Sequence, residues 1–280
     1  MRVDARWKVL GFLAVVGVGL AFLADRAAPV AAQSASRTLL AVFAHPDDEQ
    51  VVSPMLARYA REGVKVHLAI ATDGQKGVRE HAGIAAGEAL ATARAAEARC
   101  ACQQLGLEPP ILMGIQDGAL HEQENKVKAR EHVAKLLSEL KPDAVVTWGP
   151  DGVTGHTDHR MISNIVTEVI QRGGAGVTSS LFYAGFPAER LPALKDAAAG
   201  PGRPEPPLDL AVVAERYLPV HIEYTDADAT NAAKSLACHK SQYTPEELAM
   251  MTRLARTMED GAVRLRPWFG ESSASTDLFK

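Results

Sequence analysis

Residues 39–49 read LLAVFAHPDDE, and this stretch decides the fold. Its first half, Leu39–Phe43, is an unbroken apolar run rich in branched and aromatic side chains, which predicts a buried strand. Its second half places one imidazole and three carboxylates directly after that strand. Because α/β proteins bind ligands at the carboxyl ends of parallel strands, the pattern predicts a site for a divalent cation at that edge of a sheet. The alternative interpretation is a helix N-terminus with Asp47 as its N-cap.

A second polar cluster follows another apolar run. Residues 148–159 read WGPDGVTGHTDH after the strand-like segment 144–147, and two His and one Asp fall within four of these residues. We expect His45, Asp48 and His159 to form a set of two imidazoles and one carboxylate with open positions for water and substrate, as catalytic zinc sites require. The same ligands also suit Fe(II), so ligand type alone does not choose the metal.

Strand-like and helical patterns alternate along the chain. We expect strands at 39–43, 64–72, 111–113, 144–148 and 181–184, with helices at 49–62, 88–105, 126–140 and 158–171. This order predicts an α/β fold with a Rossmann-like, mostly parallel sheet, helices on both faces and the active site at the carboxyl ends of the strands.

The pattern changes after the fifth strand. Residues 185–207 contain six Pro, which predicts a long surface loop over the mouth of the site. An edge strand at 218–223, helices at 226–240 and 245–258 and a short tail complete the expected fold. The pattern shows no internal repeat and no second domain, so residues 33–280 are expected to form one domain.

The first 32 residues have the order of a signal peptide. Basic residues within 1–8 precede an uncharged apolar run, Val9–Ala24, and the small residues Val30-Ala31-Ala32 follow. A membrane-spanning helix needs about 20 residues to cross roughly 30 Å of hydrocarbon, and this run is shorter. We therefore expect export after cleavage behind Ala32. The alternative is an uncleaved anchor, which would be the membrane contact of the chain.

Net charge and cysteine content indicate which partners and which cross-links to expect. Removing residues 1–32 takes away four Lys or Arg and two Asp or Glu, so the formal charge changes from −4 to −6. This balance argues against a nucleic-acid partner, which would need a basic face. Cys100 and Cys102 are two apart on an expected helix and point away from each other. Cys238 has no obvious partner, so all three are expected to be free or buried thiols.

Two sequence boxes, Ala44–Glu49 and Gly155–His159, resemble those of the LmbE/PIG-L family of zinc-dependent N-acetylglucosaminyl deacetylases. Weaker matches support the resemblance, and they are Thr72–Gly74, Arg94–Glu97 ahead of Leu105-Gly106, Asp117-Gly118, Pro142–Val146 and Lys234–Gln242. Together the matches run from Leu39 to about Gln242, which is most of the chain. Thr154 and Thr157 depart from the family pattern, where some members carry Tyr and Pro.

The resemblance implies a hydrolase that removes an acyl group, an acetyl group in the family, from an N-acylated amino sugar, a glycoconjugate or a related amide. It implies zinc as the cofactor and Asp47 as the general base for the attacking water. We assign His156 to stabilising the oxyanion and protonating the departing amine, with Asp158 holding its tautomer. The alternative for His156 is a purely structural role.

Arg94, Glu49 and His239 are the expected substrate-binding residues, and each has a structural alternative. An Arg on an Ala-rich helix is usually solvated, Glu49 can cap its own helix, and His239 can pack in the core. Two other functions stay open. One is a metal-dependent phosphoesterase, although two-metal phosphoesterases need more converging carboxylates than the sequence offers. The other is a metal- or glycan-binding protein without catalytic activity.

Overall fold

The computed structural model describes residues 37–173, 180–199, 210–269 and 274–280. Its strands form one sheet in the order β3-β2-β1-β4-β5-β7-β6. Their bounds are β1 Thr38–Phe43, β2 Lys65–Thr72, β3 Ile111–Ile115, β4 Ala144–Trp148, β5 Ser180–Ala184, β6 Val220–Glu223 and β7 Ala262–Pro267. The strands β1 to β5 are parallel, whereas β7 runs antiparallel to both β5 and β6. The expected mostly parallel sheet is confirmed, with β6 at its edge.

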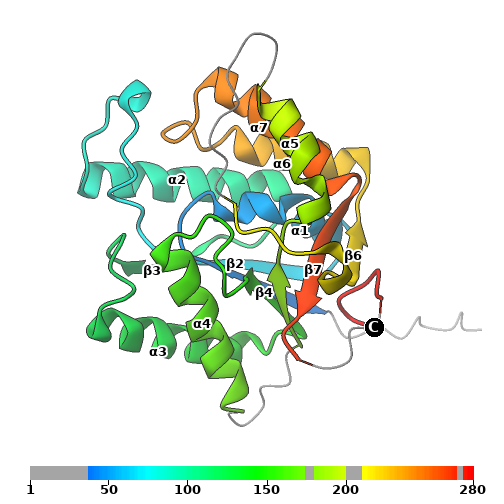
Figure 1. Cartoon of the computed structure of the whole chain (residues 1–280). Helices are drawn as coiled ribbons and strands as arrows, with labels where there is room; N and C mark the ends of the chain where they lie inside the picture. Colours follow the sequence, from blue (N-terminus) through cyan, green and yellow to red (C-terminus); the bar gives the residue numbers. More distant parts are fainter. Residues whose placement is uncertain (1–36, 174–179, 200–209, 270–273) are drawn as a thin grey trace, which may run out of the picture. The chain divides into compact units, whose positions relative to one another are not determined.

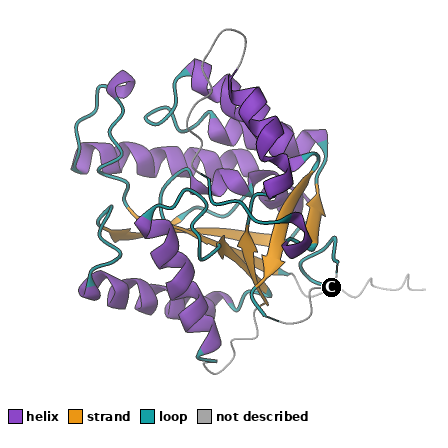
Figure 2. Cartoon of the chain, viewed as in Figure 1, coloured by secondary structure: helices purple, strands orange, loops and turns teal. Residues whose placement is uncertain are grey.

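Helices cover both faces of this sheet. Their bounds are α1 Ser53–Arg61, α2 Glu88–Leu105, α3 Gln123–Leu140, α4 Thr157–Gln171, α5 Leu191–Ala199, α6 Asp226–Leu236 and α7 Pro245–Glu259. The helices α1, α2 and α6 pack together on one side of the sheet, and α3 and α4 pack on the other (Figures 1 and 2). Because β1 is covered on both faces, every residue from Leu39 to Phe43 is fully buried, which explains its unbroken apolar run.

The order of the strands positions the site. From β1 the chain winds outward through β2 to β3, and then returns to place β4 on the other side of β1. The gap between β1 and β4 is therefore the point where the strand order reverses, which is where open α/β sheets bind ligands. The two polar clusters of the sequence follow β1 and β4, so the topology brings them together.

Two expectations for the C-terminal half were wrong. The Pro-rich stretch 185–207 contains α5. Pro192 is the second residue of this helix, and a proline is tolerated there because N–H groups in the first turn have no hydrogen-bond partner within the helix. Leu194 and Ala198 of α5 pack on Leu254 of α7, and residues 200–207 lie outside the described part. The expected tail contains β7, which was not predicted because two Arg interrupt its apolar pattern. Arg264 is nonetheless buried, and it pairs with Glu215 at 3.0 Å.

Helix boundaries also differ from the expected ones. The segment expected as one helix from residue 49 begins with a 3-10 turn, Asp48–Val51, before α1 starts at Ser53. The helix expected to reach residue 240 ends at Leu236, so His239 lies in the turn that follows α6.

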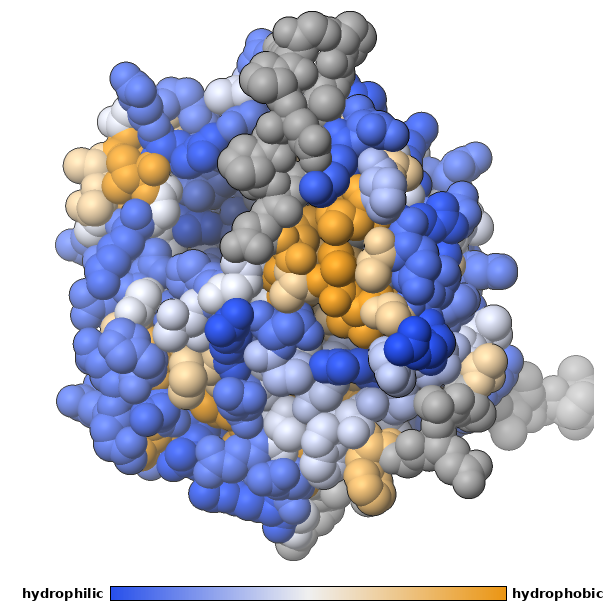
Figure 3. Space-filling model, viewed as in Figure 1, coloured by the Kyte–Doolittle hydropathy of each residue, from blue (hydrophilic) through white to orange (hydrophobic). Residues whose placement is uncertain are grey.

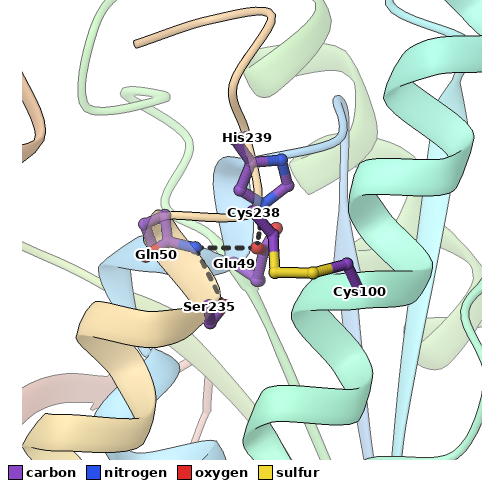
Figure 4. The surroundings of a disulfide bond; sticks show 6 residues. All are labelled: Glu49, Gln50, Cys100, Ser235, Cys238 and His239. Atoms are coloured by element: carbon purple, nitrogen blue, oxygen red, sulfur yellow. Dashed lines mark hydrogen bonds and ion pairs between the residues drawn. A yellow bond between two sulfur atoms is a disulfide. The ribbon is translucent and has the colours of Figure 1, made fainter. Parts of the chain in front are cut away.

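The prediction of three unpaired thiols was wrong. Cys100 on α2 and Cys238, just after α6, form a disulfide with their Cα atoms 5.8 Å apart (Figure 4). The two cysteines of α2 do point apart, as expected, but α6 packs beside α2 and supplies the partner. Cys102 is a buried free thiol.

The segment expected to be a signal peptide or anchor, residues 1–32, lies outside the described residues. Among the residues that the structure does describe, no helix combines the length and the apolar character needed to cross a membrane.

Candidate active site

Three side chains from the two polar clusters place their donor atoms together. His45 Nδ1 lies 3.1 Å from His159 Nε2, and His159 Nε2 lies 3.1 Å from Asp48 Oδ1. Asp48 Oδ2 is 3.6 Å from His45 Nδ1. Tetrahedral ligands at about 2.0–2.2 Å from a cation are separated by about 3.3–3.6 Å. The three expected ligands are therefore neighbours at close to this separation, with His159 nearest Asp48 Oδ1 and His45 nearest Oδ2.

Asp48 is held in place by main-chain and indole N–H groups. Its Oδ2 accepts hydrogen bonds from the N–H of Ala44 at 3.0 Å and of His45 at 2.9 Å, and from Trp148 Nε1 at 3.1 Å. Burial alone would raise the pKa of Asp48, but His159 and His45 hold it well below its usual range. The side chain is therefore an oriented carboxylate, as a metal ligand must be.

His159 is oriented by its second ring nitrogen. Nδ1 lies 3.0 Å from Gly152 O and 3.2 Å from Thr154 Oγ1. The ring stacks on Trp148 with the ring centroids 4.5 Å apart. A neutral imidazole that donates Nδ1–H to the carbonyl keeps the lone pair of Nε2 free for a metal.

His45 is oriented in the same way by carboxylates. Its Nε2 lies 3.2 Å from Asp117 Oδ1 and 3.5 Å from Asp158 Oδ2, so Nε2–H faces these oxygens and Nδ1 is left as the ligand atom. Burial alone would lower the pKa of His45, but the carboxylates of Asp48, Asp117 and Asp158 raise it to about 12. The three carboxylates therefore make this position favourable for a positive charge, which a cation on Nδ1 would supply.

The expected role of Asp158 needs correction. Its carboxylate accepts the N–H of Gly118 at 2.7 Å and of Leu120 at 3.2 Å, and it faces His45. It does not hold the tautomer of His156, because that ring bonds to the main chain of Asp158: His156 Nδ1 accepts the Asp158 N–H at 3.1 Å. This contact makes His156 the N-cap of α4.

His156 is exposed beside the ligand set. Since its Nδ1 accepts a main-chain N–H, the ring proton is on Nε2, which can donate a hydrogen bond. Partial desolvation, followed by the charges of His45 and His159, lowers the pKa of His156. The donor atoms of these three imidazoles lie within 4.8 Å of one another, as do those of His45, Asp117 and Asp158. Both groups of donors share His45.

Asp47 has a different environment from its neighbour Asp48. Its φ of 105° is in the left-handed region, which a non-Gly residue occupies at an energetic cost. Its carboxylate makes no capping bond to the 3-10 turn. Instead, Oδ1 accepts from Arg94 Nη2 at 2.9 Å and Oδ2 accepts from Tyr243 OH at 3.3 Å. Burial raises the pKa of Asp47 above its ordinary value, although Arg94 and His239 oppose the shift.

Arg94 was expected on the substrate, but its hydrogen bonds go to the protein. It is 3% exposed and donates to Asp47, to Pro46 O and to Gly74 O. Glycine is needed beside it, because a Cβ at Gly77 would lie 2.7 Å from Arg94 Nη1. Arg94 reaches the wall of the pocket, and its contacts hold the loop that carries Asp47.

Glu49 and His239 lie beneath the site and not at its surface. Both are fully buried, and His239 Nε2 is 2.7 Å from Glu49 Oε1 (Figure 4). Glu49 Oε2 accepts the Asp47 N–H at 3.1 Å, and Gln50 bonds Oε1 at 2.8 Å. With no exposed surface, neither side chain is open to a substrate in this structure; the pair supports the strained backbone at Asp47.

Sequence reasoning missed the roles of two residues. Asp117 follows β3 as His45 follows β1, so the same strand-end pattern could have identified it. Burial alone would raise the pKa of Asp117, but the hydrogen bond and charge of His45 lower it to about 2. Tyr243 had no sequence signal, because only the packing of the turn after α6 brings its hydroxyl to Asp47.

Sequence comparison finds a family that is similar to the segment containing this site. Residues 40–170 match the family described as PIG-L, GlcNAc-PI de-N-acetylase. One relative, 1D-myo-inositol 2-acetamido-2-deoxy-alpha-D-glucopyranoside deacetylase 2 of Catenulispora acidiphila, is 34% identical over 162 residues, which cover 50% of this chain and 53% of that protein. The chain thus spans about half the length of the curated relatives it matches.

Solved structures share the fold at low sequence identity. The N,N'-diacetylchitobiose deacetylase of Pyrococcus horikoshii superposes with a TM-score of 0.61 and 16% identity over 83% of this chain and 84% of that one. The 4-carboxy-2-hydroxymuconate hydratase GalB of Pseudomonas putida gives 0.59 and 15% over 84% and 97%. Since one fold supports both activities, the fold alone does not choose the reaction. Both polar clusters fall inside residues 40–170, the segment that is similar to the PIG-L family.

Proposed function

We propose that the protein is a zinc-dependent hydrolase that removes an acyl group from an N-acylated amino sugar or glycoconjugate. The observation that carries the proposal is the convergence of His45, Asp48 and His159. The two ring nitrogens are 3.1 Å apart, His159 Nε2 is 3.1 Å from Asp48 Oδ1, and His45 Nδ1 is 3.6 Å from Asp48 Oδ2. Asp47 lies beside this set with its carboxylate bonded to neighbouring side chains. The names of the curated relatives, which are deacetylases of an acetamido sugar, support the same reaction.

The donor set fits zinc. Two imidazoles and one carboxylate leave a position for water and substrate in a four-coordinate site. When bound, the cation supplies Lewis-acid polarisation of the amide carbonyl and lowers the pKa of water to about 7. Fe(II) accepts the same ligands, so metal analysis of the purified protein is part of the test.

Asp47 is the group that takes the proton of the attacking water in this proposal. Arg94 and Tyr243 each bond one of its oxygens, which fixes the carboxylate, and its raised pKa makes it a better base than an ordinary Asp. His156 can donate a hydrogen bond from Nε2–H to the oxyanion, because its Nδ1 accepts the Asp158 N–H and the ring proton is therefore on Nε2. The proton that Asp47 takes from the water passes to the departing nitrogen. Asp47 therefore serves as the base and then as the acid, and His156 stabilises the oxyanion.

The test is release of free amine from N-acetylglucosamine and related N-acylated sugars by the zinc-loaded full chain, with phosphate release from an aryl phosphate measured in parallel. We expect amine release that depends on the metal. Phosphate release without amine release would favour the phosphoesterase alternative. Metal binding with neither product would indicate a binding protein.

We also propose that the protein is exported. The basic, apolar and small-residue order of residues 1–32 supports this, and so does the disulfide of Cys100 and Cys238, because disulfides persist in oxidising compartments. Mass spectrometry of the protein from its native host should find an N-terminus near Gln33 in the exported fraction. An intact chain attached to membranes would favour the anchor, and an intact soluble cytoplasmic chain would contradict both.

A further inference from the structure

The pocket that contains the ligand set extends well beyond it. The cavity measures about 500 Å³, and the same cavity is lined at one end by His45, Asp48 and His159 and elsewhere by side chains of α5, α6 and α7. Most of this second part is hydrophobic. We call this part the chamber, and its lining includes Val51, Phe186, Leu194, Leu210, Met251 and Leu254. Figure 3 shows a continuous hydrophobic patch to the right of the centre of the molecule, with hydrophilic residues on its right and below it.

One face of α6 makes room for this chamber. Ala229, Ala232, Ala233 and Leu236 line the cavity, and their spacing of three and four residues places them on one side of the helix. Three of the four are Ala, so the helix presents a smooth wall without filling the space. Ala227 on the same helix is exposed and does not line the cavity.

The chamber offers few free hydrogen-bonding groups. Thr252 Oγ1 already donates to Leu248 O at 2.8 Å, and Ser53 Oγ donates to Gln50 O at 3.3 Å. Arg256 is exposed. Sugar hydroxyls buried here would lack partners, and each unsatisfied polar group costs free energy. A hydrocarbon chain gains free energy in the same space.

We propose that the chamber binds the acyl chain of the substrate, so that the protein prefers N-acyl groups longer than acetyl. Of the two halves of an N-acyl amino sugar, only the acyl chain is apolar, and its carbonyl carbon must lie at the ligand set. The chain then passes from the ligand set into the chamber within one continuous cavity. This inference rests on the proposed hydrolase function and names its substrate class.

The test compares kcat/KM for N-acetyl-, N-butanoyl- and N-octanoylglucosamine with the zinc-loaded full chain. Burial of a methylene is worth about 0.8 kcal/mol, or roughly fourfold in kcat/KM. We expect at least a tenfold gain from acetyl to octanoyl. Octyl N-acetylglucosaminide carries the chain on the sugar instead. A gain with this compound and none with the N-octanoyl sugar would overturn the proposal in favour of an apolar aglycone.

Two substitutions on α6 test whether the chamber causes the preference for long acyl chains. Ala233→Leu fills the chamber and should lower the octanoyl-to-acetyl ratio of kcat/KM at least tenfold, whereas Ala227→Leu, the same change on the exposed side, should leave the ratio unchanged. An unchanged ratio in Ala233→Leu, or equal kcat/KM for all three chain lengths in the wild type, would overturn the inference while amine release still supports the hydrolase.

The chamber can also be tested if the protein shows no turnover of any N-acyl sugar. If no N-acyl sugar releases amine, the hydrolase proposal fails, and calorimetric binding of the same two sugars tests the chamber separately. Tighter binding of N-octanoylglucosamine than of N-acetylglucosamine, lost in Ala233→Leu, would still support the chamber. Equal or absent binding would contradict it.

Discussion

The adjacent residues Asp47 and Asp48 have carboxylates in different surroundings. Asp48 faces two imidazoles and has a lowered pKa, whereas Asp47 faces Arg94 and Tyr243 and has a raised pKa. Environments that separate the pKa values of neighbouring acids commonly separate their roles. Here one carboxylate is suited to hold a cation and the other to accept a proton.

Asp47→Asn tests this separation. The amide is nearly isosteric and lies outside the ligand set, so zinc should remain bound at one equivalent per chain. Turnover should fall about 10²–10⁴-fold, which is the usual contribution of a general base, with little change in KM. Metal analysis and steady-state kinetics on one preparation measure both quantities. Near wild-type turnover with zinc in place would mean that another group is the base.

His159→Ala should have the opposite pattern. The substitution removes one of three donor atoms, so the variant should lose zinc during dialysis against a mild chelator and lose activity with it. His156→Ala is the matched control, since it removes a neighbouring imidazole that is not in the proposed set, and it should keep zinc while turnover falls. Full metal occupancy in His159→Ala would show that the ligand assignment is wrong.

At the level of elements, the disulfide ties α6 to α2 next to the site. It joins Cys100 and Cys238 across 138 residues of sequence, and Cys238 immediately precedes His239, the partner of Glu49. Closing a loop of this length restricts the unfolded chain, which typically stabilises the native state by about 2–5 kcal/mol.

Cys238→Ala should therefore lower the free energy of unfolding by about 2–5 kcal/mol, measured by denaturant titration. A reductant should lower the stability of the wild type and leave that of Cys238→Ala unchanged. In Cys102→Ala, which removes only the free thiol, the effect of the reductant should persist. A wild type that is insensitive to the reductant, once its thiols are shown to be reduced, would contradict this role.

The elements with strong local signals could be predicted from sequence, and those that depend on tertiary contacts could not. The helix at 88–105 and the strand at 144–148 have the expected bounds, because Gly106 ends the first and an apolar run defines the second. The strand β7 was not predicted because its two Arg interrupt the apolar pattern of a strand. Its pairing with both β5 and β6, which the sequence does not reveal, makes it a strand nonetheless. The helix α5 was missed because its Pro falls in the first turn.

At the scale of the whole molecule, topology assembles the site. His45 and His159 are more than a hundred residues apart, and they meet because β1 and β4 are neighbours where the strand order reverses. Motifs at strand ends made this convergence predictable. The bond of Tyr243 to Asp47 and the apolar chamber against α6 and α7 arise from packing that leaves no local pattern, so they came only from the structure.

The central claim is that one divalent cation on His45, Asp48 and His159 makes this fold a hydrolase of N-acyl amino sugars. The most direct measurement is a titration of the metal-stripped full chain with zinc, following amine release from N-acylated glucosamine. Our account predicts no release without metal, and a rise that reaches its plateau at one zinc per chain. Release by the metal-free protein, or no release after one zinc is bound, would contradict it.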